Sequence, residues 1–160
     1  MMGPRRVSIQ LDCKGFFRSA VQNSVPDQTG VYFVYAGVKT ETGCSIRRLL
    51  YIGRSANLHL RLTSPESFER LQGALQPGEE LFYAYAFVAS EEASLVERAL
   101  ALHFSGLIFS EASASSIDLP VLEVEISLTG DGVPRIFTAE DRTFVASWNS
   151  GPQTETGQDG

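Results

Sequence analysis

The sequence GVYFVYA at residues 30–36 and the sequence LLYIG at residues 49–53 decide the fold. Both are rich in β-branched and aromatic residues and carry a glycine at one end, which is typical of strands. No helical periodicity separates them, so the two segments are expected to pair as an antiparallel hairpin. A third strand is expected at residues 81–89, where both alternating sets of positions are apolar. Such a strand is covered on both faces, which predicts helices on each side of the sheet.

Three helices are expected around this sheet. Ser55 is a suitable N-cap for a helix that begins at Ala56, and a second helix is expected to begin near Pro65. Ser90 is expected to cap a third helix, which carries Glu97 at the edge of its apolar face. The glutamate is therefore placed where its carboxylate needs a partner, because an unpaired carboxylate is costly to bury.

The rest of the chain extends this unit at both ends. Residues 7–11 are expected to form a strand, and residues 14–21 a short helix. Near the C-terminus, residues 121–128 alternate between apolar and polar, and the turn after them predicts a return strand at residues 135–137. A short helix is expected at residues 139–148.

These patterns predict one domain with elaborations. Residues 1–29 are expected to form an N-terminal elaboration, residues 30–110 the main domain, and residues 111–150 a C-terminal hairpin and short helix packed on it. Residues 151–160 contain little to bury and are expected to be a disordered tail. A chain of 160 residues is long enough for one well-packed domain and short for two.

Composition indicates a cytoplasmic protein without a membrane segment. No apolar run approaches the roughly 18 residues of a membrane span, and no secretory apolar region follows the N-terminus. Cys13 and Cys44 stand alone, without a Cys-x-x-Cys motif or a histidine at ligand spacing. Both are therefore expected to be free thiols in a reducing cytosol.

The charge distribution leaves one region suited to phosphate. The net charge of −6 argues against binding nucleic acid over the whole surface, because phosphate affinity comes mainly from lysine and arginine. Between residues 47 and 61, however, the chain carries no acid and four arginines, which are Arg47, Arg48, Arg54 and Arg61. These arginines either form a local basic patch or are scattered on the surface, and the sequence leaves both interpretations open.

Two tyrosine motifs, an arginine and a glutamate follow one another along the chain. They are G-V-Y at residues 30–32 and Y-I-G at residues 51–53, then Arg61 ten residues after Tyr51, and Glu97. This order and spacing resembles the GIY-YIG nuclease family over about residues 30–104, about half of the chain. The resemblance implies an α+β fold in which a small three-stranded antiparallel sheet is flanked by helices.

The resemblance also implies a metal-dependent endonuclease that hydrolyses a phosphodiester bond in DNA or RNA, with DNA favoured. Tyr32 and Tyr51 would position and deprotonate the attacking water, and Arg61 would brace the phosphate as negative charge builds. Glu97 would be the single protein ligand to a magnesium or manganese ion. Nucleic-acid contacts would come from the other three arginines of the basic stretch and from an asparagine one helical turn before Arg61. These residues are Arg47, Arg48, Arg54 and Asn57.

Each of these residues also has a purely structural interpretation. Tyr32 and Tyr51 could simply fill one face of the sheet, and a phenol with a pKa of about 10 is a poor base without a cation nearby. Arg61 could be a surface arginine whose stem covers apolar area. Glu97 could be half of an ion pair with an arginine at the edge of the core.

The sequence departs from the family pattern at two places. Pro65 stands where the family commonly carries a histidine or tyrosine, and residues 109–111 lack the family's asparagine. Neither His59 nor His103 lies at a position that could substitute. The alternative function is therefore a catalytically degenerate module that binds nucleic acid or a protein partner, and a purely structural tyrosine-rich domain is a third possibility. Sequence specificity, pathway and oligomeric state are not indicated.

Overall fold

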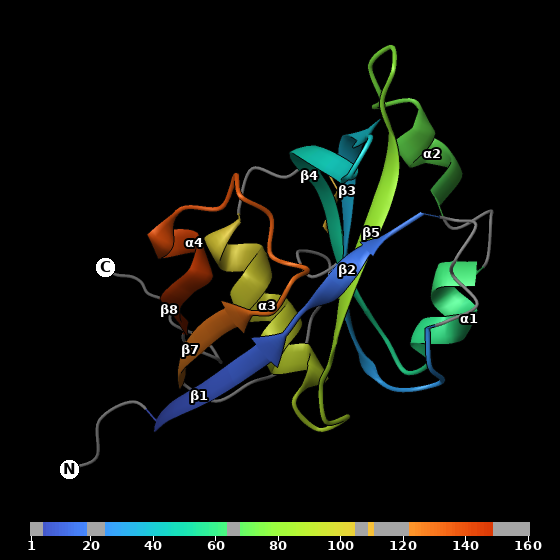
Figure 1. Ribbon diagram of the computed structural model, residues 1–160. Helices are drawn as coiled ribbons and strands as arrows, with labels where there is room; N and C mark the ends of the chain where they lie inside the picture. Colours follow the sequence, from blue (N-terminus) through green and yellow to red (C-terminus); the bar gives the residue numbers. More distant parts are fainter. Residues whose placement is uncertain (1–4, 19–24, 64–67, 105–108, 111–121, 149–160) are drawn as a thin grey trace, which may run out of the picture.

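The protein has an α+β fold with two sheets (Figure 1). The computed structural model describes residues 5–18, 25–63, 68–104, 109–110 and 122–148. The expected second-helix start at Pro65 and the expected tail at residues 151–160 lie outside the described residues. Within the described part, no helix is long and apolar enough to cross a membrane. Cys13 and Cys44 are both free thiols.

The larger sheet has five strands in the order β2-β5-β3-β4-β6. In chain order they are β2 (Lys14–Phe17), β3 (Gly30–Thr40), β4 (Gly43–Ser55), β5 (Glu80–Phe87) and the two-residue β6 (Phe109–Ser110). The expected antiparallel hairpin is confirmed in β3 and β4, and β5 pairs antiparallel with the other edge of β3. The three expected strands are thus the centre of a larger sheet.

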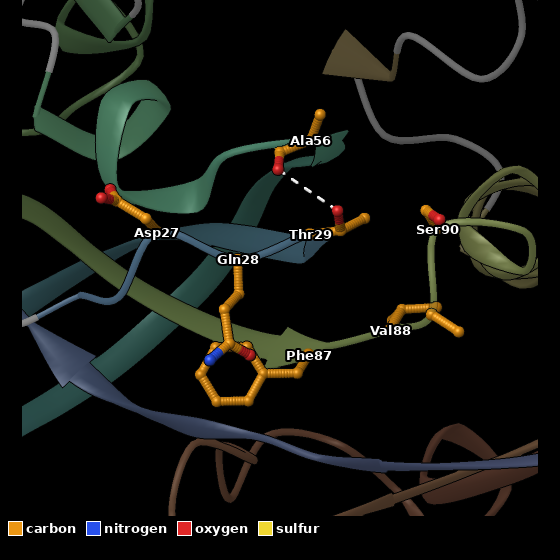
Figure 2. A pocket seen from close by; sticks show the side chains of 8 residues that line it. Asp27, Gln28, Thr29, Ala56, Phe87, Val88 and Ser90 are labelled. Atoms are coloured by element: carbon orange, nitrogen blue, oxygen red, sulfur yellow. Dashed lines mark hydrogen bonds between the residues drawn. The ribbon is translucent and has the colours of Figure 1, made fainter.

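The hairpin is longer than the sequence predicted. Residues 37–48, which separate the two segments that the sequence identified, mostly belong to the two strands, and only residues 41–42 remain between them. Leu50 and Arg47 have no partner in the ladder, so β4 bulges twice against β3. At the opposite end of the hairpin, the hydroxyl of Thr29 donates to the carbonyl oxygen of Ala56 (3.2 Å; Figure 2). This hydrogen bond holds the segments that flank the two strands together.

A second, three-stranded sheet was not predicted. It consists of β1 (Arg5–Asp12), β7 (Leu122–Thr129) and β8 (Thr143–Trp148), in the order β1-β7-β8. β1 runs parallel to β7, and β8 runs antiparallel to it.

Three local predictions outside the main domain need correction. Residues 14–17 form the strand β2 and no helix, because they complete the edge of the larger sheet beside β5. The return arm of the C-terminal hairpin is β8, and residues 135–137 belong to the connection that precedes it. The expected helix at 139–148 is therefore confined to α4 (Ala139–Arg142), which Thr138 and Asp141 cap reciprocally.

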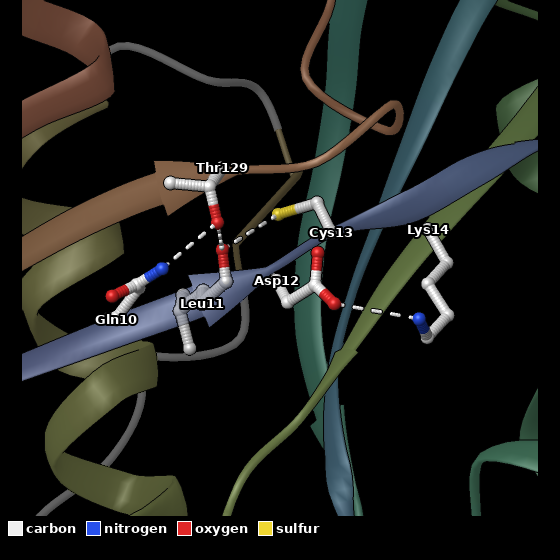
Figure 3. Close-up of polar contacts among 6 residues, drawn as sticks. All are labelled: Gln10, Leu11, Asp12, Cys13, Lys14 and Thr129. Atoms are coloured by element: carbon white, nitrogen blue, oxygen red, sulfur yellow. Dashed lines mark hydrogen bonds and ion pairs between the residues drawn. The ribbon is translucent and has the colours of Figure 1, made fainter.

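The N-terminal strand passes from one sheet to the other at Cys13. The backbone N–H of Cys13 donates to the carbonyl oxygen of Thr129 (2.7 Å), and that of Gly132 donates to the carbonyl oxygen of Cys13 (2.9 Å). A Cβ atom on Gly132 would lie 2.7 Å from the carbonyl carbon of Lys14, so only glycine allows this close approach. Figure 3 shows the side chains of Cys13 and Thr129 converging on the carbonyl oxygen of Leu11. Hydrogen bonds from the end of β7 and the connection after it thus hold the junction of β1 and β2 in place.

Helices cover both faces of the larger sheet, as the sequence predicted, and the unpredicted second sheet adds to the cover of one face. The first face packs against α1 (Leu58–Thr63) and α2 (Glu69–Gln72), and we call it the α1 face. The second packs against α3 (Ala93–His103) and the three-stranded sheet, and we call it the α3 face. Each face has its own apolar core, and these two cores determine which site residues can meet.

Candidate functional site

Tyr32 and Tyr51 lie side by side on the α1 face. In the β3–β4 ladder Tyr32 is opposite Gly53 and Tyr51 is opposite Val34, so both side chains project from the same face. Their ring centroids are 5.7 Å apart, with the rings inclined at 30°. Tyr32 is fully buried and Tyr51 is 3% exposed. The structure therefore brings the two phenols together, as the site prediction requires, but inside the core.

Arg61 joins this pair from α1. Its Nε donates a hydrogen bond to the hydroxyl of Tyr32 at 2.8 Å. A tyrosine needs a cation nearby to act as a base, and the site prediction can assign that role to the guanidinium of Arg61. The helix brings Arg61 to this position because Leu58 and Leu62 anchor α1 in the core of the α1 face.

Gly53 makes room for the phenol of Tyr32. A Cβ atom on Gly53 would lie 2.6 Å from the Tyr32 hydroxyl and 2.9 Å from Cε2 of Tyr51. Any other residue would displace at least one ring. The glycine of the second motif is thus explained by the packing of the two tyrosines, independently of any catalytic role.

Glu97 lies on the opposite side of the sheet, in an ion pair with Arg54. The Nε of Arg54 donates to Oε1 of Glu97 at 2.9 Å, and the side chains are 42% and 5% exposed. Arg54 is opposite Val31, which belongs to the core of the α3 face. The ion pair with an arginine, which the sequence left open as an alternative for Glu97, is present in the structure, and Arg54 is the partner.

The two halves of the predicted site lie on opposite faces of the sheet at the end of β4. Arg54 follows Gly53 directly, and consecutive Cα atoms are about 3.8 Å apart. Pairing between β4 and β6 covers only Tyr51 and Ile52, so within the described residues the outer edge of β4 is unpaired from Gly53 onward. The Tyr32 hydroxyl and the Arg54–Glu97 pair therefore flank one exposed strand end from opposite faces.

Glu97 is the only predicted metal ligand, so the predicted site would offer a cation a single protein carboxylate. Among the described residues, no three His, Cys, Asp or Glu side chains gather as a metal site. Magnesium is commonly held by one or two carboxylates, water and substrate phosphate, so a single buried carboxylate is compatible with it. The guanidinium of Arg54 already occupies Oε1, and a cation would have to share the carboxylate with Arg54 or replace it.

The residues predicted to contact nucleic acid do not form one patch. Arg48 is ion-paired with Glu79 and donates to the carbonyl oxygen of Ala74 (3.1 Å). The backbone N–H of Gln76 and the guanidinium of Arg48 lower the pKa of Glu79 below its ordinary value, against the opposing effect of burial. Glu79 is therefore ionised at neutral pH, and its negative charge neutralises Arg48.

The other members of the predicted patch are also separated. Arg54 is paired with Glu97 on the α3 face, whereas Arg47 is exposed at one of the β4 bulges. Oδ1 of Asn57 accepts a hydrogen bond from the backbone N–H of Leu60 (3.1 Å), which makes Asn57 the cap of α1. Of the four residues predicted to contact nucleic acid, only Arg47 is exposed and makes no hydrogen bond or ion pair within the described part of the chain.

His103 has a partner that the sequence did not indicate. Its Nε2 lies 2.8 Å from Oδ1 of Asp141, and its ring stacks on Phe144 with centroids 3.9 Å apart. This contact joins α3 to α4 and β8. Burial raises the pKa of Asp141, but hydrogen bonds from Thr138 and His103 outweigh it and lower the pKa below its ordinary value. His103 therefore serves the packing of the C-terminal elements, away from the tyrosine pair.

No protein-family model, curated protein or solved structure matches the chain. The resemblance to the GIY-YIG nucleases therefore rests on the two tyrosine motifs, Arg61, Glu97 and their arrangement around the end of β4.

Proposed function

We propose that the protein is a metal-dependent endonuclease of the GIY-YIG type that hydrolyses a phosphodiester bond, with DNA favoured as the substrate. The observation that supports this proposal is the arrangement around Gly53. A phenol bonded to a guanidinium flanks the exposed end of β4 on one face, and a buried carboxylate bonded to an exposed arginine flanks it on the other. A general base, two phosphate-binding cations and a metal ligand are thus available at one strand end.

The proposed roles follow from the chemistry of each group. Tyr32, held by Arg61, would accept a proton from the attacking water, and Tyr51 would orient that water beside it. Arg61 would stabilise the charge that builds on the phosphate oxygens. Glu97 would hold a magnesium or manganese ion, which when bound would supply Lewis-acid stabilisation and a more acidic water.

Arg54 has a role in this proposal that the sequence did not suggest. It blocks one oxygen of Glu97, yet its own side chain is partly exposed at the strand end. A phosphate that arrives there offers Arg54 a second anionic partner, and a guanidinium can form a forked contact with phosphate as readily as with a carboxylate. Substrate binding would then draw Arg54 from Oε1 of Glu97, and the cation would bind that oxygen in its place.

A second function is favoured by burial. Tyr32 is fully buried, and Glu97 is neutralised by Arg54. Both features suit a catalytically degenerate module that keeps the fold and binds nucleic acid or a protein partner. Pro65 and the missing asparagine in residues 109–111 point the same way.

One experiment decides between the two functions. Wild-type protein is incubated with supercoiled plasmid, single-stranded DNA and single-stranded RNA in the presence of magnesium, manganese or a chelator. The nuclease proposal expects metal-dependent nicking or cleavage that Glu97→Gln and Arg61→Ala abolish. The matched control Glu91→Gln, which alters an exposed carboxylate just before the same helix, should cleave like wild type. A wild-type protein that binds these substrates but cleaves none with either metal would support the degenerate module.

A further inference from the structure

A pocket of about 480 Å³ opens beside the proposed cleavage site. Three segments form it: the residues before β3, the residue that follows β4, and the residues around the end of β5 (Figure 2). The lining side chains that the argument uses are Asp27, Gln28, Thr29, Phe87 and Ser90. None of them belongs to the four residues of the predicted catalytic set.

Phe87 supplies an exposed aromatic surface to this pocket. It is 37% exposed, although it lies in a strand whose other large side chains are buried. Its ring is 5.4 Å from that of Tyr85, which in turn stacks on Phe17 at 5.6 Å. Phe87 is therefore the open end of a row of rings, and a planar group could extend that row. Aromatic side chains at such positions stack nucleobases without regard to sequence.

The polar lining suits an uncharged ring with hydrogen-bond donors and acceptors. Asp27, Gln28 and Ser90 are exposed and offer a carboxylate, an amide and a hydroxyl group. Thr29 is fixed by its hydrogen bond to the carbonyl oxygen of Ala56. No lysine or arginine lines the pocket, and Asp27 would repel a phosphate. A nucleobase combines a flat face for Phe87 with the N–H and carbonyl groups that these side chains can bind.

The pocket and the proposed cleavage site lie on neighbouring positions of the same strands. Phe87 is opposite Gly30, while Tyr85 is opposite Tyr32, so Phe87 and Tyr32 project from the same face. The two positions are two residues apart, which corresponds to about 7 Å along a strand. This distance is short enough for adjoining parts of one nucleic-acid strand to reach both.

We propose that this pocket binds one unstacked nucleobase of the strand that is cut, next to the scissile phosphate. The inference rests on the proposed nuclease function and narrows its substrate to single-stranded nucleic acid, or to a duplex from which a base can be extruded. Base contacts by Phe87 would position the strand, while Arg54 and Arg61 would bind the phosphate.

The test measures binding in the presence of a chelator, so that it does not depend on cleavage. A labelled single-stranded oligonucleotide is compared with a set of copies that each lack one base at a different position. One abasic position should weaken binding to wild type by about fivefold or more, the size expected for losing one stacked base. In Phe87→Leu the intact oligonucleotide should bind as weakly as that abasic copy, and the abasic copy should lose nothing further.

Controls separate the pocket from the fold and from free nucleosides. Ile136→Ala, at an exposed apolar position on another part of the surface, should bind like wild type. Should Phe87→Leu melt at a lower temperature than wild type, Asp27→Ala and Ser90→Ala at exposed positions repeat the measurement. Equal binding of all abasic copies, with no effect of these variants, overturns the proposal. So does a free nucleoside that binds the pocket without competing with the oligonucleotide.

The outcomes distinguish this inference from the nuclease proposal. If wild type cleaves in a metal-dependent way and Phe87→Leu cleaves and binds like wild type, the nuclease proposal is retained and the base pocket is rejected. If wild type shows base-dependent binding but no cleavage, the base pocket is retained and the nuclease proposal is rejected. Cleavage with a shifted cut position or reduced binding in Phe87→Leu supports both.

Discussion

The hydroxyl of Tyr32 accepts a hydrogen bond from Nε of Arg61 at 2.8 Å, and the tyrosine side chain is fully buried. This contact joins α1 to the middle of β3. It also couples the two residues functionally, because a change in either alters the environment of the other. A buried tyrosine hydroxyl usually has a hydrogen-bond partner, and for Tyr32 one such partner is a cation.

Removal of the Tyr32 hydroxyl should therefore affect activity more than stability. Tyr32→Phe takes away one hydrogen bond to a charged group, which lowers the free energy of unfolding by about 1–2 kcal/mol. If Tyr32 is the general base, cleavage should fall by about a hundredfold or more. The measurements are single-turnover cleavage and denaturant unfolding.

Tyr35→Phe is the matched control for this change. Tyr35 is also buried but lies in the core of the α3 face, where burial raises its pKa well above the ordinary range. It lies on the opposite face of the sheet from Tyr32 and Tyr51, so its variant should cleave like wild type. Equal activity of Tyr32→Phe and wild type would remove Tyr32 from the catalytic set.

Substitution of Gly53 should disturb both tyrosines at once. In Gly53→Ala the new methyl group would lie 2.6 Å from the Tyr32 hydroxyl, and neither buried ring has space to move freely. Forced repacking of this kind lowers the free energy of unfolding by about 1–3 kcal/mol. Gly73→Ala is the control, because its Cβ would lie 3.5 Å from the nearest atom, in ordinary contact. Thermal melts that are equal for the two variants would contradict the tight packing at Gly53.

Local sequence patterns carried the prediction of the central sheet but not of its surroundings. The β-branched and aromatic residues of 30–36 were enough to identify β3. The apolar residues at both alternating sets of positions in 81–89 were enough to identify β5 and to predict cover on both faces. The pairing of β1 with β7 joins residues such as Ser8 and Glu125, 117 residues apart, and depends on packing over the α3 face. No local pattern contains that information, so the second sheet was missed.

The candidate site divides in the same way. The two tyrosine motifs and the helical position of Arg61 were sufficient to predict that these three side chains meet. The partner of Glu97 could not be predicted, because Arg54 lies 43 residues earlier and its direction depends on the register of β4 against β3. The same holds for Asp141, which reaches His103 across 38 residues of chain.

The contact of Asp141 makes stability depend on acid pH. Its pKa in the folded protein is lowered from about 3.8, so the unfolded chain binds its proton more readily than the folded one. Its contribution is therefore present above the unfolded pKa and is lost as the pH falls through the folded pKa, below about pH 4. Asp141→Asn should be less stable than wild type at pH 7, and the difference should shrink towards pH 3.

The measurement is denaturant unfolding from pH 7 to pH 3, with Asp131→Asn as the control at an exposed aspartate. The control should follow the wild-type curve. A constant difference between Asp141→Asn and wild type over this range would show that the charge of Asp141 contributes nothing beyond its hydrogen bonds.

Removal of Arg54 tests the metal site without reference to catalysis. Arg54→Ala takes the guanidinium away from a carboxylate that is 5% exposed, so the variant should lose stability by about 1–3 kcal/mol at neutral pH. Glu97→Gln should have a smaller effect, because Arg54 is partly exposed and can be hydrated.

If Glu97 binds a divalent cation, magnesium or manganese should restore part of the stability of Arg54→Ala, since a ligand that binds only the folded state stabilises it. Thermal melts at increasing metal concentration measure this effect, with the double variant Arg54→Ala/Glu97→Gln as the control. A metal-dependent rise in the melting temperature of Arg54→Ala that is absent from the double variant identifies Glu97 as the ligand. Equal melts of both variants at every metal concentration would show that Glu97 has a structural role only.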